Sequence, residues 1–429
     1  MQKVLIITYY WPPAGGPGVQ RWLKFVKYLP EFGFEPWVYI PQNPHYPLED
    51  ESLLKEVPER VKILKRPITE PYRWASVFSK KQTKTISSGI IQEEKRQSLL
   101  EKMLLWVRGN LFIPDARKNW VKPSVRYLSQ ILSKENITTV ITSGPPHSLH
   151  LIGMGLKKRH PDLQWITDFR DPWTSIGYHK KLRLTASSQR KHKRLESDVL
   201  NGADKIVVTS NTTKEEFEQL TQKPIKVITN GYESGDVAMG LDQKFTVSHI
   251  GSLLTDRNPE LLWQVLSTLV KEHADFAEHL KIQLGGTVSE QVLQSVRQYG
   301  LEAHIEILGY VPHGQVQKLQ QAAQVLLLLE IDSVETRGII PGKLFEYLKA
   351  KRPILAMGPE QWEGGQIVEM TKSGRYVTSN GAQSLKEVLL KWFRAYQEGS
   401  LTINPTGIEH YHRRALTEQL ANFIIWESS

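Results

Sequence analysis

The chain has 429 residues, which is more than a single hydrophobic core usually serves and predicts two or three domains. It contains no cysteine, which excludes a disulfide framework, a thiolate metal site and a cysteine nucleophile. The net charge of +10 is uneven, because residues 1–229 carry 37 Lys and Arg against 22 Asp and Glu, whereas residues 230–429 carry 18 against 23.

The basic first half predicts an anionic partner: a nucleic acid, an acidic membrane surface or a phosphorylated substrate. The N-terminal MQKVLIITYY lacks the form of a signal peptide and reads as a first strand. No run approaches the roughly twenty apolar residues that a membrane span requires. We therefore expect a cytoplasmic protein.

The chain begins with a predicted buried strand over residues 4–8, a glycine-rich loop and a helix with a broad apolar face. Gly15, Gly16 and Gly18 in this loop would let a ligand approach backbone N–H groups closely. The loop has neither the GxGxxG spacing of dinucleotide folds nor the GK[ST] ending of a P-loop. It predicts ligand binding without identifying the ligand.

Residues 70–125 interleave basic side chains with aromatic and aliphatic ones, and part of this region reads as a basic amphipathic helix. Such a helix can lie on an anionic bilayer. It can equally be a helical insertion that packs on its own domain, so both interpretations stay open.

Polar residues follow two consecutive predicted strands, at 139–142 and 164–167. These residues are His147, Asp168, Arg170 and Asp171. In a parallel sheet they would lie along one rim, where such folds keep their sites. Helix or turn capping is the alternative for the two aspartates, and we favour a functional role for at least one of them.

Residues 233–244 have no periodicity and contain two glycines, so they are the best candidate for a linker. Strands and helices alternate again from residue 245 onwards. The pattern predicts two doubly wound α/β halves with a cleft between them.

A strand, loop, helix and strand are predicted over residues 325–357, with the helix at 343–350. Ligands of such a unit bind at the helix N-terminus. The carboxylate of Glu346 suits the two hydroxyls of a ribose, and the ammonium of Lys343 suits a phosphate. Ordinary solvent-facing charge near a helix start is the alternative.

Several stretches together resemble the GT-B glycosyltransferases, and within them the retaining glycosyltransferase family 4, over essentially the whole chain. They are GGPGVQR at 15–21, the NG turn at 230–231, GSLLTDR at 251–257, ILGYV at 307–311 and GKLFEYLKAKRPILA at 342–356. In this order and spacing the set is specific, although each stretch alone is loose.

The resemblance implies a role for individual residues. Glu346 falls on the second acid of the family's EX7E motif, which holds the nucleotide ribose, and Arg257 falls on a lysine that contacts the diphosphate. Two positions depart from the pattern: Ser252 stands where the family has an arginine, and Gly338 stands where it has the first acid, which contacts the donor sugar. Lys343 is near enough in sequence to supply the missing cation.

Glu335 or Arg337, which both precede this position by a few residues, are the candidates to replace the first acid. Asp171 falls near polar residues of the family at the end of the fifth strand, and Arg170 falls roughly where many members have histidine. Together with the place of His147 after a predicted strand, this makes Asp171, His147 and Arg170 the expected catalytic residues, and Asp171 and His147 would orient the acceptor or the sugar.

The implied architecture is two Rossmann-like, doubly wound parallel-sheet domains that face each other across a cleft. We expect an acceptor-side domain at 1–232, a linker at 233–244 and a nucleotide-sugar domain at 245–408. A C-terminal helix within 409–429 is expected to pack back on the first domain.

The implied activity is retaining hexosyl transfer from a nucleoside diphosphate sugar of the UDP or GDP type, without a further cofactor, in cell-surface polysaccharide or glycolipid synthesis. No clustered Asp-x-Asp motif is present, so we expect the reaction to need no metal. The basic half predicts an anionic acceptor such as a lipid diphosphate, and peripheral contact with the inner face of the cell membrane. No nucleic-acid module accompanies the charge, so no nucleic-acid partner is expected.

Two other functions fit the same fold. The departures at Ser252 and Gly338 suit a protein that binds a nucleotide sugar or a partner without turnover. A nucleotide-sugar epimerase would convert the donor without any acceptor.

Overall fold

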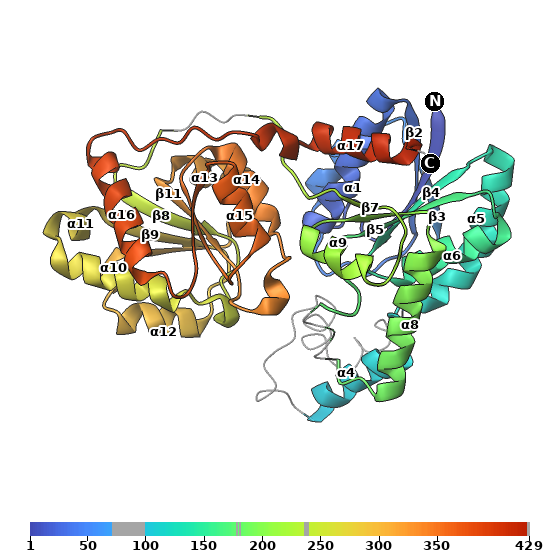
Figure 1. Ribbon diagram of the computed structural model, residues 1–429, viewed down its shortest axis with the longest axis horizontal. Helices are drawn as coiled ribbons and strands as arrows, with labels where there is room; N and C mark the ends of the chain where they lie inside the picture. Colours follow the sequence, from blue (N-terminus) through green and yellow to red (C-terminus); the bar gives the residue numbers. More distant parts are fainter. Residues whose placement is uncertain (71–98, 177–178, 180–181, 236–239, 427–429) are drawn as a thin grey trace. The chain divides into compact units, whose positions relative to one another are not determined.

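The computed structural model describes all residues except 71–98, 177–178, 180–181, 236–239 and 427–429 (Figure 1). The chain divides into two compact units, one of Met1–Thr229 with Arg413–Ser429 and one of Asn230–His412. This division falls just before the expected linker at 233–244.

The first unit is built on a sheet of seven parallel strands in the order β3-β2-β1-β4-β5-β6-β7. Their bounds are β1 (Gln2–Ile7), β2 (Phe34–Pro41), β3 (Lys62–Arg66), β4 (Thr139–Gly144), β5 (Gln164–Phe169), β6 (Lys205–Val208) and β7 (Ile225–Val227). In β1 the apolar run Val4–Ile7 is buried, and β4 is buried along its whole length, as expected for central strands of a parallel sheet covered by helices.

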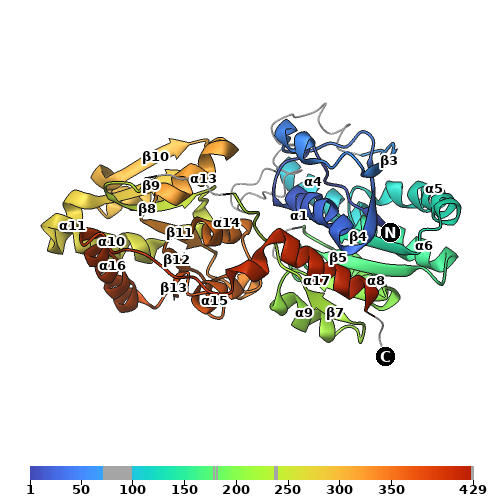
Figure 2. The same cartoon turned by 90° about the horizontal axis from the view of Figure 1, so that it is seen from above.

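The helices of the first unit are α1 (Pro17–Tyr28), α4 (Leu99–Leu111), α5 (Lys118–Glu135), α6 (Ser148–Arg159), α8 (Ala186–Gly202), α9 (Asn211–Glu218) and α17 (Arg413–Ile425). The chain's last helix, α17, lies beside α1 (Figure 2) and buries Leu416, Leu420 and Ile424 in the core of this unit. The Lys205 ammonium donates to the carbonyl oxygens of Phe423 and Ile424 at 2.9 Å and so caps the helix's C-terminus.

The second unit has six parallel strands in the order β10-β9-β8-β11-β12-β13. They are β8 (Phe245–Ile250), β9 (Leu280–Gly285), β10 (Ile305–Gly309), β11 (Val325–Leu329), β12 (Ile354–Met357) and β13 (Gly374–Val377). The helices are α10 (Glu260–Glu272), α11 (Ala274–His279), α12 (Glu290–Gln298), α13 (His313–Ala322), α14 (Gly342–Ala350), α15 (Glu363–Met370) and α16 (Ala382–Gln397).

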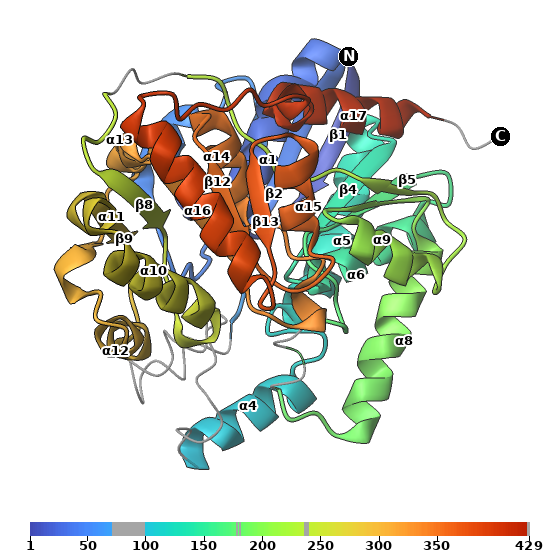
Figure 3. The ribbon, with the colours of Figure 1, turned by 60° about the vertical axis from the view of Figure 1, so that its left-hand side comes forward.

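Strand β11 shows how the second sheet separates two cores. Leu327 and Leu329 pack into the core that contains α10 and α16, which lie side by side in Figure 3. Leu326 and Leu328 pack into the other core, with α14 and α15. Successive side chains of a strand point to opposite faces, so a continuous leucine run fills both cores.

Both sheets are doubly wound, and the prediction of two Rossmann-like parallel-sheet domains is confirmed. In each sheet the strand order reverses beside the first strand, between β1 and β4 and between β8 and β11. Ligands of open α/β sheets bind at the carboxyl ends of the strands near such a reversal. A functional site is therefore expected at the carboxyl ends of these strands.

Part of the predicted amphipathic region, residues 71–98, lies outside the described residues. Its later part forms α4 and α5, and α4 exposes Met103, Trp106 and Leu111. Across the residues that the structure does describe, every helix is too short or too polar to span a bilayer.

Candidate functional site

Three glycines with positive φ angles lie at the carboxyl ends of neighbouring strands in the second sheet, and together they form what we call the glycine edge. Gly251, Gly286 and Gly309 follow or end β8, β9 and β10 and have φ angles of 137°, 103° and 63°. A Cβ on Gly286 would lie 2.8 Å from the carbonyl carbon of Gly251. The backbone of Gly251 therefore excludes a side chain at position 286, and the positive φ angles favour glycine at all three positions.

Lys343 lies above this glycine edge, in the first turn of α14. Its Nζ would be 2.5 Å from a Cβ on Gly251 and is 3.2 Å from Nε2 of His249. Burial, followed by the charge of Arg257, lowers the pKa of Lys343 to about 8, against the opposing charges of Glu346 and Glu330. The fold thus brings Lys343, Arg257 and Glu346, which were predicted separately, within electrostatic reach of each other.

Arg257 ends a short 3₁₀ helix, Thr255–Arg257, and forms a forked ion pair with Glu330. Nε and Nη2 of the arginine are 3.1 and 2.9 Å from Oε1 of Glu330, and Nη2 is 3.2 Å from Oε2. The Glu330 side chain is fully buried, and the N–H of Ile331 also donates to it at 2.9 Å. A buried carboxylate is costly without such partners, so Glu330 fixes where the arginine lies.

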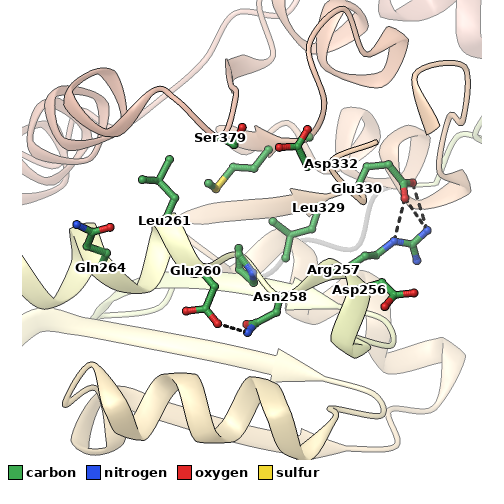
Figure 4. A pocket seen from close by; sticks show the side chains of 13 residues that line it. Asp256, Arg257, Asn258, Glu260, Leu261, Gln264, Leu329, Glu330, Asp332 and Ser379 are labelled. Carbon is green, nitrogen blue, oxygen red and sulfur yellow. Dashed lines mark hydrogen bonds and ion pairs between the residues drawn. The ribbon is translucent and has the colours of Figure 1, made fainter. Parts of the chain in front are cut away.

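A pocket of about 390 Å³ opens beside this ion pair (Figure 4). Its lining comes from the segment after β8, from the first turns of α10 and from the carboxyl ends of β11, β12 and β13: Asp256, Arg257, Asn258, Pro259, Glu260, Leu261, Gln264, Leu329, Glu330, Asp332, Met357, Gly358 and Ser379. Arg257 is among these lining residues, whereas Lys343 and Glu346 are not.

Glu346 follows Lys343 by about one helical turn on α14. Its Oε2 accepts a hydrogen bond of 2.9 Å from Nε2 of Gln320 on α13. The amide thereby orients the carboxylate, which keeps further acceptor capacity for a ligand's hydroxyl groups.

The two positions that depart from the family pattern lie near the same edge. Ser252 is exposed and follows Gly251, and Gly338 is half-buried in the turn before α14. The indole N–H of Trp362 donates to the carbonyl of Ile339 at 2.7 Å and holds this turn from the β12–α15 loop.

In the first unit, the glycine loop meets the end of β5. A Cβ on Gly18 would overlap Nη1 of Arg170. The Arg170 guanidinium also donates from Nε to the carbonyl of Gly144 at 3.3 Å and from Nη2 to that of Pro145. Gly16, at the N-cap of α1, has a φ of 96° that favours glycine. Gly15 donates its N–H to the carbonyl of Leu48 at 2.9 Å.

Asp168 is fully engaged inside the first unit. It accepts hydrogen bonds from Arg21 Nη2 at 2.8 Å, Trp22 Nε1 at 2.9 Å and Ser143 Oγ at 2.7 Å. Burial alone would raise its pKa, but Arg21 and these bonds outweigh burial and lower it. Asp168 thus joins α1, β4 and β5, which is a structural role.

Asp171 differs from Asp168 because it is half-buried. Burial raises its pKa, against the opposing charge of Arg170. Of the two aspartates, Asp171 is therefore the one placed to act on a ligand, and this role stays a prediction.

His147 precedes α6 and is only 5% exposed. Its ring stacks on that of Trp173, with centroids 4.8 Å apart and planes 3° apart. Burial, followed by the neighbouring His150, lowers its pKa well below the ordinary value. Neither ring nitrogen has a hydrogen-bond partner among the described residues. The stack favours a packing role in this conformation, and the catalytic role remains a prediction.

Sequence reasoning missed His249, Glu330 and Gln320. His249 and Glu330 lie within or at the end of apolar strand runs, where an ionisable residue is rarely buried without a partner. An ionisable residue in or next to a predicted strand was therefore the sequence signal that could have identified His249 and Glu330. Outside the undescribed segments, no group of three or more His, Asp and Glu side chains could hold a metal ion.

No protein-family model matches the chain, and no curated protein matches it in sequence. Solved structures match it over nearly its whole length. A glycosyltransferase from Rickettsia africae has 12% identity and a TM-score of 0.58, with 100% of this chain and 99% of that chain covered. The lipopolysaccharide outer core galactosyltransferase WaaB has 14% identity and a TM-score of 0.58, with 99% of each chain covered.

The G117R mutant of TarM from S. aureus, solved with fondaparinux, α-GlcNAc-glycerol and UDP, has 12% identity and a TM-score of 0.58. The match covers 99% of this chain and 100% of that chain. These structural neighbours are GT-B glycosyltransferases, and the fold of the present chain is theirs.

Proposed function

We propose that the protein is a glycosyltransferase that moves a sugar from a nucleoside diphosphate sugar to an acceptor. The observation that carries the proposal is the cluster of Lys343, Arg257 and Glu346 at the glycine edge of the second sheet. The GT-B fold supports it, as does a neighbour of this fold that was solved with UDP.

In this proposal the diphosphate lies over Gly251, near Lys343 and Arg257. The N-terminus of α14 adds the partial positive charge of its unpaired N–H groups. The Glu346 carboxylate, which Gln320 orients, accepts hydrogen bonds from the two ribose hydroxyls. We assign the donor to the UDP or GDP type.

Transfer breaks the bond between the anomeric carbon and the diphosphate oxygen, while the acceptor oxygen bonds to the same carbon. Negative charge grows on the departing diphosphate, so stabilising that charge is the main catalytic task. We assign it to Lys343, Arg257 and backbone N–H groups, without metal. If the leaving phosphate itself takes the acceptor's proton, a retaining reaction needs no protein nucleophile.

We further propose that the chain is of the family 4 type and that Asp171, Arg170 and His147 orient the acceptor or the sugar. The glycine loop of Gly15, Gly16 and Gly18 would offer its amides to the donor. The Arg170 guanidinium, which lies against this loop, supports a shared role for the two elements.

The acceptor is proposed to be anionic and lipid-linked, at the inner face of the cell membrane, in polysaccharide or glycolipid synthesis. The basic first half supports this, since residues 1–229 carry a balance of +15. Sedimentation with neutral and anionic lipid vesicles tests the membrane contact. We expect binding to anionic vesicles alone, and equal binding to both would overturn this part.

The nucleotide is tested first by thermal unfolding with UDP, GDP and ADP. A ligand that binds only the folded protein raises its melting temperature with increasing concentration. A protein stabilised by none of the three would contradict the proposal.

Turnover is then tested with the matching nucleotide sugars and extracted lipid acceptors. We expect release of nucleoside diphosphate that requires an acceptor and is lost in Lys343→Ala and Glu346→Ala. Lys271→Ala removes an exposed lysine of the same unit and serves as the control. Donor conversion without an acceptor would indicate an epimerase, and nucleotide binding without either reaction would indicate a binding protein.

A further inference from the structure

His249 is a fully buried histidine whose two ring nitrogens both have partners. It lies near the end of β8, immediately before Ile250 and the glycine edge. Nδ1 is 2.8 Å from the carbonyl oxygen of Leu327 on β11, and Nε2 is 3.2 Å from Nζ of Lys343 on α14. The imidazole of His249 therefore connects β8 and β11, between which the strand order reverses, to helix α14.

The partners determine which nitrogen carries the proton. A carbonyl oxygen only accepts hydrogen bonds, so Nδ1 must donate to Leu327. Burial lowers the pKa of His249 to about 3, and the nearby Lys343 contributes to this shift. The ring is thus neutral at physiological pH, and its Nε2 presents a lone pair to the lysine.

The lysine has three N–H groups, and the contact with His249 uses one of them. The other two remain for a ligand above Gly251. A lysine side chain without such a partner would lose rotamer freedom when it is ordered by a ligand. A buried acceptor lowers that loss, because the ammonium is already held in place.

We propose that His249 is a positioning residue, which holds the Lys343 ammonium over Gly251 in the orientation that receives a diphosphate. This inference rests on the proposed function, since it assumes that the glycine edge binds a nucleoside diphosphate. It adds a residue on β8 that contacts Lys343 but takes no part in the chemistry.

Two substitutions separate this role from a purely structural one. In His249→Asn the amide nitrogen can occupy the place of Nδ1 and keep the bond to Leu327, but no atom reaches Lys343. In His249→Gln the longer side chain places an oxygen near the position of Nε2, so Lys343 keeps an acceptor while the bond to Leu327 is lost.

The test is calorimetric titration of wild type and both variants with UDP and GDP at pH 7, after thermal unfolding has shown that all three are folded. We expect His249→Asn to weaken nucleotide binding about tenfold, because the ammonium loses its acceptor, and His249→Gln to stay within about threefold of wild type. Wild-type affinity in His249→Asn, or equal losses in the two variants, would overturn the positioning role.

A double-mutant cycle with Lys343→Met makes the test specific, since residues that act through one another are non-additive. In the Lys343→Met background, His249→Asn should cause no further loss of affinity. A full additional tenfold loss would show that His249 acts otherwise. A wild-type protein that binds neither nucleotide would overturn the proposed function together with this inference, whereas the other outcomes bear on His249 alone.

Discussion

The two sheets carry their charged groups at corresponding edges, but the charges have opposite environments. In the first unit the Asp168 carboxylate is paired with Arg21, and its pKa is lowered, so the folded state stabilises its charge. In the second unit the Lys343 ammonium lies near Arg257 as well as near acids, and its pKa is lowered to about 8, so the folded state disfavours its charge. The ion pair of Asp168 and Arg21 serves the fold, whereas the charge of Lys343 would be stabilised further by an anionic ligand.

The largest effect on stability is expected at Asp168. Asp168→Ala leaves the fully buried Arg21 without its carboxylate, and removing one partner of a buried pair costs about 3–5 kcal/mol. Denaturant unfolding of the wild type and the variant measures this loss. Asp171→Ala, at the half-buried neighbour, is the control and should cost less than about 1 kcal/mol. Similar losses at both positions would remove the distinction between them.

Lys343→Met should have the reverse effect on stability. Because the pKa is about 8 in the folded state against 10.5 for an ordinary lysine, the unfolded chain binds more protons between these values. The stability of the wild type should therefore rise as the pH increases from 8 to 10.5. The variant should lack this rise and gain on the order of 2 kcal/mol at pH 7. Unfolding curves at pH 7 and pH 10 check both, and an unchanged rise in the variant would contradict the assignment.

Of these substitutions, Gly18→Ala in the first unit should change the free energy of unfolding least. The new Cβ would meet the guanidinium of Arg170, the far end of a flexible side chain that can move aside. We expect the free energy of unfolding to change by less than about 1 kcal/mol. If Arg170 orients the acceptor or the sugar, turnover should fall about tenfold, whereas unchanged turnover would exclude that role.

Much of the fold could be predicted from the sequence, because the local periodicity of apolar residues indicates where strands and helices form. The leucine run of β11 and the helix around Leu344 and Leu348 lie where a strand and a helix were expected. The two compact units divide between Thr229 and Asn230 and again between His412 and Arg413, and the expected domain bounds stay a prediction.

The candidate site could be predicted only in part, because pairing depends on contacts between distant segments. Lys343 and Glu346 were identified from their place at a helix start. The partners that fix them, His249 and Gln320, lie 94 and 26 residues earlier in the chain. Likewise, nothing in the motif DFRD distinguishes Asp168, which Arg21 neutralises, from Asp171.

The central claim, that Lys343 receives a diphosphate, is tested most directly by proton uptake during nucleotide binding. Calorimetric titration with UDP or GDP at pH 8.5, in two buffers of different ionisation enthalpy, gives the number of protons bound. A lysine with a pKa of about 8 is mostly neutral there, and a bound diphosphate should restore its charge, so we expect uptake of roughly 0.7 proton. The Lys343→Met variant should take up none. Binding without proton uptake in the wild type, or equal uptake in both proteins, would contradict the account.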